Sequence, residues 1–372
     1  MDNLTHSLVG LTAAKAGLEK LSPGATALCL LAANVPDADI VVLAFGDTWT
    51  FLQHHRGITH SVIGVVCVAF ALPLIFYLVD LLWSRFKKQS PKIKLKGLMV
   101  ASFIVSATHP LLDWTNSYGV RFWLPWSQKW SYGDLVFIVD PYLWLMLGGA
   151  AFLLTAKTTL LKFIWAAIAA ILTFLVVASP RSDSLPNHRL IALLWIVALV
   201  ALIVLLVKGA RERWGSKIAF VSFALVLSYW GLLAFAHSRA IARGSEEAAR
   251  LVSSNGEAIA RLAAMPTLAN PFRWDCVFET EQATYRFNLG LVGGSPGSAV
   301  RYAKPAQQLQ ETVSQQRPAQ VFLGFARFPV MQLAEPGCTT RTLVQLADLR
   351  YTEPGRSRGS FSLELPVDCP VQ

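Results

Sequence analysis

Residues 190–207 have the sequence LIALLWIVALVALIVLLV, a run without a charged side chain. A helix of about 20 apolar residues crosses the hydrocarbon core of a bilayer, so this run predicts a transmembrane helix. The composition of the 372-residue chain agrees, because 54% of its residues are hydrophobic and 15% are charged, whereas a soluble domain has about 25% charged residues. These values exclude a disordered chain and a single soluble globule, and they predict an integral membrane protein.

Seven further segments are apolar enough to lie in the membrane with this helix. They are residues 8–18, 26–45, 62–79, 97–112, 142–155, 163–178 and 218–236. The first of them is short and contains a lysine, and the second carries an asparagine and two aspartates. The sequence therefore predicts an α-helical integral membrane domain with about eight membrane helices, the first two of which need cross only in part.

The character of the sequence changes after residue 237. The next stretch is rich in Ala, Arg and Glu, which predicts a helical connector. Beyond Pro266, apolar and polar residues alternate in short runs such as 285–289 and 361–365, and a period of two is typical of β-strands. The expected division is 1–237 for the polytopic membrane domain, 238–265 for the connector and 266–372 for a smaller β-rich soluble domain.

The charge of the loops predicts the side of the membrane on which each loop lies. Residues 84–96, 156–162 and 208–217 are basic, and short basic loops stay in the cytoplasm. Alternating helices place all three on that side, so we expect the metal-site candidates below and the C-terminal domain to face the periplasm or the exterior. The same loops explain much of the net charge of +10, which removes the argument for a nucleic-acid partner.

The five cysteines show no CxxC or other close spacing, so a cysteine-based zinc site is not expected. Cys276, Cys338 and Cys369 lie in the domain that we expect in an oxidising compartment, where disulfides form. We expect two of them to form a disulfide, with Cys338–Cys369 favoured, and the third to be buried or free.

Polar residues interrupt the apolar helices at four places, although an ionisable group at membrane depth costs about 2.5–3.5 kcal/mol. The four motifs are THS at 5–7, NVPDAD at 34–39, HHRGITHS at 54–61 and HPLLD at 109–113. The predicted topology brings all four to the outer face of the membrane domain. A single histidine or aspartate at a helix end is usually a capping or interfacial residue, but four such motifs at one face favour a shared site.

His109 and Asp113 are four residues apart, so a helix presents both on one face. Imidazole and carboxylate ligands without thiolate suit zinc, manganese or iron. Asp37 and Asp39 offer a second pair of carboxylates, and Pro36 breaks the helix that precedes them. Two ions that share one carboxylate would clamp and activate a water for hydrolysis. Asp37 or Asp39, whichever is not fully engaged as a ligand, would accept the proton.

Three residues of the third motif have roles that the sequence leaves open. Arg56 fits a bidentate contact with a phosphate or carboxylate, and it fits an anchor to lipid headgroups equally well. His54 and His55 are expected to hydrogen-bond a ligand or to contact substrate rather than to bind the metal.

The four motifs resemble those of the bacterial inner-membrane metal-dependent hydrolases, also described as LexA-binding, inner-membrane-associated hydrolases. The resemblance covers about residues 1–150, and the family is distantly similar to zinc-dependent phospholipase C and the S1/P1 nucleases. It implies a location in the bacterial inner membrane and a cluster of zinc ions. The metal ligands that it implies are His6, one of Asp37 and Asp39, His60, His109 and Asp113, with Asp113 bridging two ions.

The sequence departs from the phospholipase pattern, because a later His…His-x-x-x-Glu set for another zinc is absent. Two ions are therefore expected rather than three, with zinc favoured and manganese or iron as alternatives. The LexA-binding description implies a cytoplasmic partner, but the predicted topology leaves little soluble surface on that side, so we do not expect that partner.

Two classes of function follow from these motifs. The first is a hydrolase at the outer membrane–water boundary that acts on a lipid or lipid-linked phosphoester, like phospholipase C or a phosphatase, with lipid ester or amide hydrolysis as alternatives. The second is a non-catalytic membrane anchor or regulator with a structural metal, whose C-terminal domain binds an unknown protein partner. Structural sites are closed by protein ligands, whereas catalytic sites keep an open position. Five or six ligands shared by two ions leave positions open, which favours the hydrolase.

Overall fold

The computed structural model describes residues 1–178, 188–253, 256–293, 296–335, 341–356 and 359–368. The chain divides into two compact units. The helical unit contains Met1–Ala38, Arg56–Ala234 and Thr267–Asn270, and the sheet unit contains Asp39–His55, Phe235–Pro266 and Pro271–Gln372.

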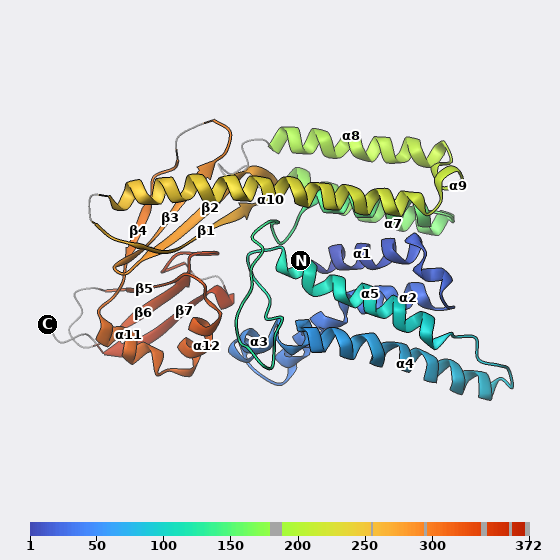
Figure 1. Ribbon diagram of the computed structural model, residues 1–372, viewed down its shortest axis with the longest axis horizontal. Helices are drawn as coiled ribbons and strands as arrows, with labels where there is room; N and C mark the ends of the chain where they lie inside the picture. Colours follow the sequence, from blue (N-terminus) through green and yellow to red (C-terminus); the bar gives the residue numbers. More distant parts are fainter. Residues whose placement is uncertain (179–187, 254–255, 294–295, 336–340, 357–358, 369–372) are drawn as a thin grey trace. The chain divides into compact units, whose positions relative to one another are not determined.

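The long helices of the helical unit run in similar directions (Figure 1). Its elements in chain order are α1 (Asn3–Ala16), η1 (Leu18–Lys20), α2 (Ala25–Asn34), η3 (Ile58–His60), α4 (Val62–Phe86), α5 (Leu95–Trp114), α6 (Pro141–Thr155), α7 (Thr159–Ala178), α8 (His188–Val207), α9 (Ala210–Trp214) and the first part of α10 (Lys217–Val252). The 3-10 helix η2 (Val35–Ala44) follows α2 directly and leads into the sheet unit.

Six stretches of the described residues are long and apolar enough to cross a membrane. They are Ala25–Ala44, Val62–Phe86, Leu95–Trp114, Thr159–Val177, Arg189–Val207 and Lys217–Val252. The expected helical membrane region is therefore confirmed, but the expected count of eight is not. The two further helices, α1 with 14 residues and α6 with 15 residues, are shorter than the roughly 20 residues of an ordinary span.

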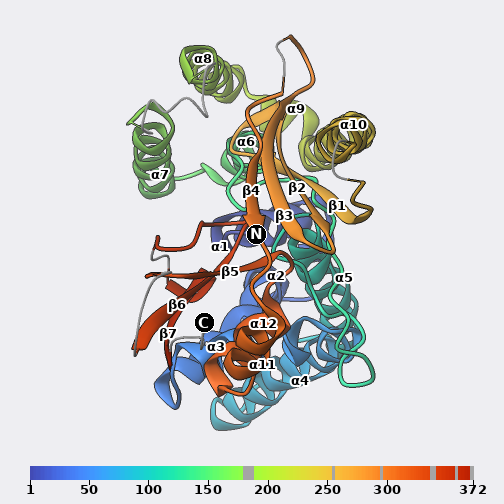
Figure 2. The same ribbon diagram turned by 90° about the vertical axis from the view of Figure 1, so that its left-hand side faces the viewer.

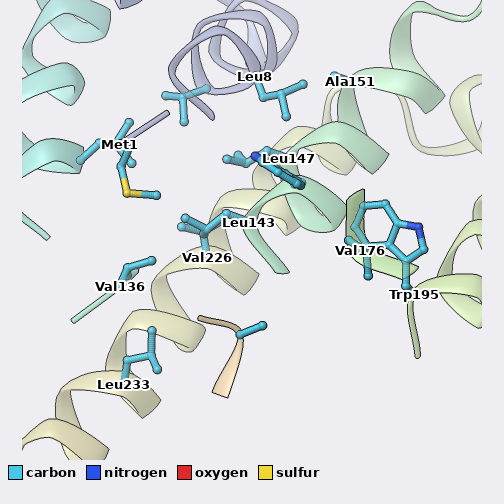
Figure 3. Packing of buried hydrophobic residues seen from close by; sticks show 14 of the residues in the cluster. Met1, Leu8, Val136, Leu143, Leu147, Ala151, Val176, Trp195, Val226 and Leu233 are labelled. Atoms are coloured by element: carbon cyan, nitrogen blue, oxygen red, sulfur yellow. The ribbon is translucent and has the colours of Figure 1, made fainter. Parts of the chain in front are cut away.

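These two short helices contribute to the apolar core of the helical unit. Leu8 on α1 and Leu147 on α6 are buried in one apolar cluster (Figure 3). Gly10 allows α1 to approach α2 closely, because a Cβ atom there would lie 2.6 Å from the carbonyl oxygen of Cys29. This packing fixes the first turns of α1, which carry His6, within the helical unit.

The described residues of the sheet unit form a four-stranded and a three-stranded β-sheet, which Figures 1 and 2 show in two views 90° apart. The first has the strand order β1-β2-β3-β4 and the second the order β5-β6-β7. The strands are β1 (Ile259–Thr267), β2 (Asn270–Thr280), β3 (Ala283–Gly290), β4 (Val300–Ala303), β5 (Pro329–Leu333), β6 (Arg341–Asp348) and β7 (Ser362–Asp368). The helices are α3 (Thr48–His54), the last part of α10, α11 (Gln307–Ser314), α12 (Arg317–Phe325) and η4 (Gly359–Phe361).

The first sheet packs against the last part of α10. Trp274 and Phe278 from β2 and Phe287 from β3 are buried in one cluster with the small residues Ala240 and Ala248 of α10. The small residues let the large aromatic side chains of the sheet lie close to the helix. The expected β-rich C-terminal domain is therefore confirmed.

The connector differs from the expectation over 238–265. The helix α10 ends at Val252, and the strand β1 already begins at Ile259. Gly256 has φ +65°, a left-handed conformation that glycine adopts without strain and that ends regular helix. The helical part of the connector is therefore shorter than expected, because its last residues pair into the first sheet.

Cys276 is the one of the three C-terminal cysteines that lies within the described residues. Cys276 is buried and is not in a disulfide, and burial raises the pKa of its thiol to about 12. Cys338 and Cys369 lie outside the described residues.

Candidate metal centre

Four side-chain atoms from three parts of the helical unit converge on one point. Asp37 Oδ1 lies 3.3 Å from His60 Nε2 and 3.5 Å from His109 Nε2. Asp113 Oδ2 lies 3.1 Å from His60 Nε2 and 3.3 Å from His109 Nε2, and the two imidazole Nε2 atoms are 3.0 Å apart. All four atoms lie within 4.8 Å of one another. The structure thus brings together one carboxylate of the Asp37/Asp39 pair and three of the other residues expected as ligands.

These separations fit a metal ion. Zinc binds histidine nitrogen and carboxylate oxygen at about 2.0–2.2 Å, usually with tetrahedral geometry, in which neighbouring ligand atoms are about 3.3–3.6 Å apart. The observed separations of 3.0–3.5 Å are close to these values. Asp113 Oδ2 is buried and has no hydrogen-bond donor among the described residues, which would be costly without a cation.

The tautomer of a neutral His109 is set by one backbone contact. Its Nδ1 lies 2.6 Å from the carbonyl oxygen of Ala33, which only accepts hydrogen bonds, so Nδ1 carries the proton. A neutral His109 therefore presents the lone pair of Nε2 to the other donors, the usual arrangement of a metal-binding histidine. His60 Nδ1 lies 3.0 Å from the hydroxyl oxygen of Thr59, which can donate or accept, so this contact orients the ring without setting its tautomer.

Backbone structure places each ligand. His109 and Asp113 lie one turn apart on α5, as their spacing predicted, and both are buried. Asp37 lies in the 3-10 helix η2, which follows the end of α2 at Asn34. His60 ends η3, and Ser61 immediately caps α4 by accepting a hydrogen bond from the N–H of Gly64.

His6 lies beside the four donors rather than among them. Its ring stacks on that of His109 with centroids 3.8 Å apart, and its Nε2 lies 3.4 Å from Asp113 Oδ1. Neither ring nitrogen of His6 has a hydrogen-bond partner among the described residues, although the side chain is buried. The amino group of Met1 also pairs with Asp113 Oδ1. Asp113 thus contributes Oδ2 to the four-donor group and presents Oδ1 to His6, as a bridging carboxylate would.

Arg56 is an internal residue of this site. Its side chain is buried, and its Nη2 lies 2.8 Å from Asp113 Oδ1. Its Nη1 donates to the backbone carbonyl of Asp113 at 3.2 Å and to Asn116 Oδ1 at 3.1 Å, and the guanidinium lies over the ring of Tyr118, 4.6 Å from the centroid. The guanidinium therefore holds the end of α5 that carries Asp113.

Asp39 and His55 belong to the sheet unit. Asp39 is buried, and its Oδ1 lies 3.1 Å from His55 Nδ1. The ring of His55 also stacks on Phe51, with centroids 4.7 Å apart. The sequence predicted Asp39 as a possible proton acceptor or metal ligand, and His55 as a contact of a metal ligand or of the substrate. In the structure these two residues are paired with each other.

The sequence analysis did not anticipate two contacts of the site. The hydroxyl of Thr59 and the carbonyl of Ala33 each hold one ring nitrogen of a ligand histidine. Threonine immediately before a histidine in the HHRGITHS motif is the only sequence signal for the first contact. A backbone carbonyl leaves no signal in the sequence, because every residue has one.

The residues of this centre lie in the N-terminal part of the chain, which is similar to known proteins. Residues 1–182 match the family model described as YdjM inner membrane protein. The uncharacterized protein YfhP of Bacillus subtilis (strain 168) is 27% identical over 155 residues, which cover 39% of this chain and 43% of YfhP. The inner membrane protein YbcI of Escherichia coli (strain K12) is 29% identical over 129 residues, which cover 34% of this chain and 68% of YbcI. No solved structure matches the chain.

The similarity lies in the helical N-terminal region, and the chain spans less than half the length of YfhP. Together with the six apolar helices, it supports a multi-pass protein of the bacterial inner membrane that is similar to the YdjM inner membrane proteins.

Proposed function

We propose that this chain is a membrane-embedded, metal-dependent hydrolase that acts at the outer membrane–water boundary on a lipid or lipid-linked phosphoester. The observation that carries the proposal is the convergence of Asp37, His60, His109 and Asp113 inside an apolar helical unit. Buried charges of this kind are retained where they bind ions or do chemistry. A divalent ion bound there lowers the pKa of a bound water and polarises a phosphoryl or carbonyl oxygen.

The four donors hold the first ion, for which zinc fits best. His6 Nε2 and Asp113 Oδ1 offer a second position, so two zinc ions that share Asp113 are the proposed complement. Arg56 Nη2 lies 2.8 Å from the same Oδ1, so its guanidinium would remain beside Asp113 if these residues held an ion. Arg56 accordingly serves to hold Asp113 rather than to bind the substrate.

Asp39 is assigned as the proton acceptor, because Asp37 already belongs to the four donors. Asp39 Oδ1 lies 3.1 Å from His55 Nδ1, and a carboxylate that accepts from Nδ1–H orients the ring and stabilises its protonated form. Asp39 therefore accepts the proton as one half of a hydrogen-bonded pair with His55.

The membrane depth of the site supports a lipid substrate. The loop that follows α5, just beyond Asp113, exposes 61% of Trp123 and 74% of Trp126. Exposed tryptophans of a membrane protein gather at the headgroup level. A site at this end of α5 meets lipid headgroups and lipid-linked phosphates first.

The chain segments that make up the sheet unit support the proposed orientation. Residues 39–55 and the C-terminal strands belong to the same unit, so both lie on one side of the membrane. An even number of helices must then cross between them, which requires α6 to cross along with α4, α5, α7, α8 and α10. A 15-residue helix is about 22 Å long, and its burial among other helices lets it cross a core of about 30 Å.

If α1 crosses as well, the number of membrane helices is the eight that the sequence predicted. The three basic loops then lie in the cytoplasm, and the sheet unit and the metal centre face the periplasm or the exterior.

Metal loading combined with lipid hydrolysis tests the proposal. The purified protein is loaded with zinc, manganese or iron, and the release of phosphate or headgroup is measured over a panel of phosphoester, ester and amide lipids. Asp39→Asn should keep its metal and lose about 10²–10⁴-fold in rate, the usual loss for a general base. Asp368→Asn, at an exposed position at the end of β7, is the control and should change neither quantity. If the wild-type protein releases nothing from any lipid, the chain is a membrane anchor or regulator instead.

A further inference from the structure

A groove lies between the helices α6, α8 and α10 of the helical unit. Its volume is about 610 Å³, within the range of roughly 300–1,000 Å³ that is usual for ligand sites. The short helix α9 joins α8 to α10 at one end of the groove (Figure 1). Gly149 on α6 and Ala198 and Ala201 on α8 line it, and these small residues leave the space that larger side chains would fill.

The wall of this groove is almost entirely apolar. Ser222 carries the one hydroxyl among the described residues that line it, and this hydroxyl donates a hydrogen bond to the backbone carbonyl of Met146 at 2.8 Å. Only Trp214 and Lys217 add a further polar side-chain group to the wall. A buried water needs about two to four polar partners, so the groove is suited to an apolar occupant.

The groove extends inward from the end of the membrane helices. Lys217 is the first residue of α10, and Leu225 lines the groove eight residues farther along the same helix. Eight residues of α-helix span about 12 Å, and half of a hydrocarbon core of about 30 Å is about 15 Å thick. The groove therefore extends through about one leaflet of the membrane, the depth that an acyl chain of a phospholipid occupies.

Basic and aromatic residues gather at the α9 end of the groove. Trp214 and Lys217 both line the groove there. The guanidinium of Arg213 lies over the ring of Trp214, 5.5 Å from the centroid, whereas Arg211 pairs with Glu212 at 3.0 Å. Tryptophan is enriched at the membrane–water interface, and basic pockets between membrane helices bind anionic headgroups. This end thus presents positive charge at the level of the lipid phosphates.

We propose that this groove is a binding site for one anionic phospholipid, with an acyl chain between α6, α8 and α10 and the phosphate beside Lys217 and Arg213. Burial of the acyl chain against the apolar wall supplies affinity. The basic end supplies selectivity, because it repels the ammonium group of a zwitterionic headgroup. None of the residues that line the groove belongs to the metal centre, so the inference does not rest on the proposed hydrolase.

The test counts the lipids bound to the full-length protein in detergent by native mass spectrometry. The two probes are phosphatidylglycerol and phosphatidylethanolamine with identical acyl chains. A chelator is present, so that the proposed hydrolase consumes neither lipid. We expect one phosphatidylglycerol per chain, bound at least about 5-fold more tightly than phosphatidylethanolamine, which is the effect of one basic residue on an anionic lipid.

A charge variant tests the basic end. Lys217→Gln should lower the affinity for phosphatidylglycerol about 5-fold and leave that for phosphatidylethanolamine unchanged, whereas Lys217→Arg should keep the preference. Lys96→Gln is the matched control, because Lys96 is an exposed lysine on α5, a helix that does not line the groove. This control should bind both lipids like the wild type.

A second variant tests the groove itself. Ala201→Phe places a large side chain in the groove and should remove the bound lipid, whether anionic or zwitterionic. Ala167→Phe on α7 is the matched control, because Ala167 is exposed and does not line this groove. Circular dichroism of both variants measures their helicity, so that a loss of binding is distinguished from a loss of fold.

Three outcomes would overturn the inference. Equal wild-type affinities for the two lipids would show that the basic end does not select an anionic headgroup. Equal losses in Lys217→Gln and Lys96→Gln would show a general attraction to the charged protein. A helical Ala201→Phe protein that still binds one phosphatidylglycerol would show that the lipid binds elsewhere. All three leave the metal centre intact, because metal loading tests that centre separately.

Discussion

The guanidinium of Arg56 lies 2.8 Å from the carboxylate of Asp113, and both side chains are buried in the helical unit. Arg56 reaches this position with a backbone φ of +50°, a left-handed conformation that costs about 1–3 kcal/mol for residues other than glycine. Such strain persists only where the surroundings impose it. The site therefore constrains the backbone of the HHRGITHS motif as well as its side chains.

Arg56→Met should destabilise the helical unit. The substitution keeps an unbranched apolar side chain but leaves Asp113 without its nearest guanidinium, and loss of one partner of a buried ion pair costs about 3–5 kcal/mol. Thermal unfolding in detergent, followed by circular dichroism, measures the effect. Arg121→Met is the control, because Arg121 is also largely buried but lies over Trp130, 4.6 Å from the ring centroid. Equal unfolding temperatures for Arg56→Met and the wild type would contradict the assigned role.

Gly64→Ala should weaken zinc binding. A Cβ atom at Gly64 would lie 2.2 Å from the carbonyl oxygen of Ile58 and 2.6 Å from that of Thr59, so η3 and its His60 would have to move. We expect about a 10-fold loss of zinc affinity or more, and destabilisation by about 1–3 kcal/mol.

The control is Gly231→Ala on α10, where an added Cβ meets nothing within 4 Å. This variant should bind zinc like the wild type, and removal of a helical glycine should stabilise it by up to about 1 kcal/mol. Identical zinc affinities for the two alanine variants would show that η3 does not set the position of His60.

Asp140 should make stability depend on pH. Its carboxylate caps α6 by accepting from the N–H groups of Tyr142 and Leu143, and it accepts from the hydroxyl of Tyr229 at 2.9 Å. Burial nevertheless raises the pKa of Asp140 from 3.8 to about 6. The folded protein therefore keeps a proton that the unfolded chain releases, so stability should fall as pH rises from about 4 to about 6, by up to about 3 kcal/mol.

Asp140→Asn should remove this pH dependence, because asparagine caps a helix as well as aspartate does and does not ionise. Unfolding temperatures at pH 4.5 and pH 7 give the comparison. Asp47→Asn is the matched control, because Asp47 caps α3 in the same way but is exposed. A wild-type protein and an Asp140→Asn variant with the same pH dependence would show that Asp140 is not the responsible group.

Cysteine labelling in intact cells should place residue 53 outside the cytoplasm and residues 89 and 157 inside it, as the proposed topology requires. On a background without other cysteines, Gln53→Cys should react with a membrane-impermeant maleimide, whereas Gln89→Cys and Lys157→Cys should react only after lysis. Lys157 is the informative position, because it lies on the cytoplasmic side only if α6 crosses the membrane. Labelling of residue 157 in intact cells would place α6 on the membrane surface and reverse the side assigned to the C-terminal strands.

The sequence predicted those features of the site that depend on local periodicity. His109 and Asp113 lie on one helical face because their spacing matches the helical repeat, and the structure brings both together with Asp37 and His60. The apolar runs predicted the helical region for the same reason. The sequence alone does not decide whether the short helices α1 and α6 cross the membrane, because that depends on the helices that bury them.

Other features depend on tertiary packing and could not be predicted. The structure places Asp37 beside His60 and Asp39 beside His55, an arrangement that depends on how the 3-10 helix η2 directs the two side chains. The burial of Arg56 depends on Asn116 and Tyr118, which are distant in sequence. The assignment of residues 39–55 to the sheet unit depends on Trp49 finding an apolar cluster formed by the C-terminal strands.

X-ray absorption at the zinc edge of the purified, zinc-loaded protein tests the central claim most directly, because it measures the ligands of the ion. The account predicts nitrogen and oxygen ligands at about 2.0–2.2 Å, an imidazole signal that is reduced in His60→Ala and His109→Ala, and no sulfur. Zinc–sulfur distances of about 2.3 Å, or a spectrum that is unchanged by both histidine substitutions, would show that the metal binds elsewhere and would contradict the proposed centre.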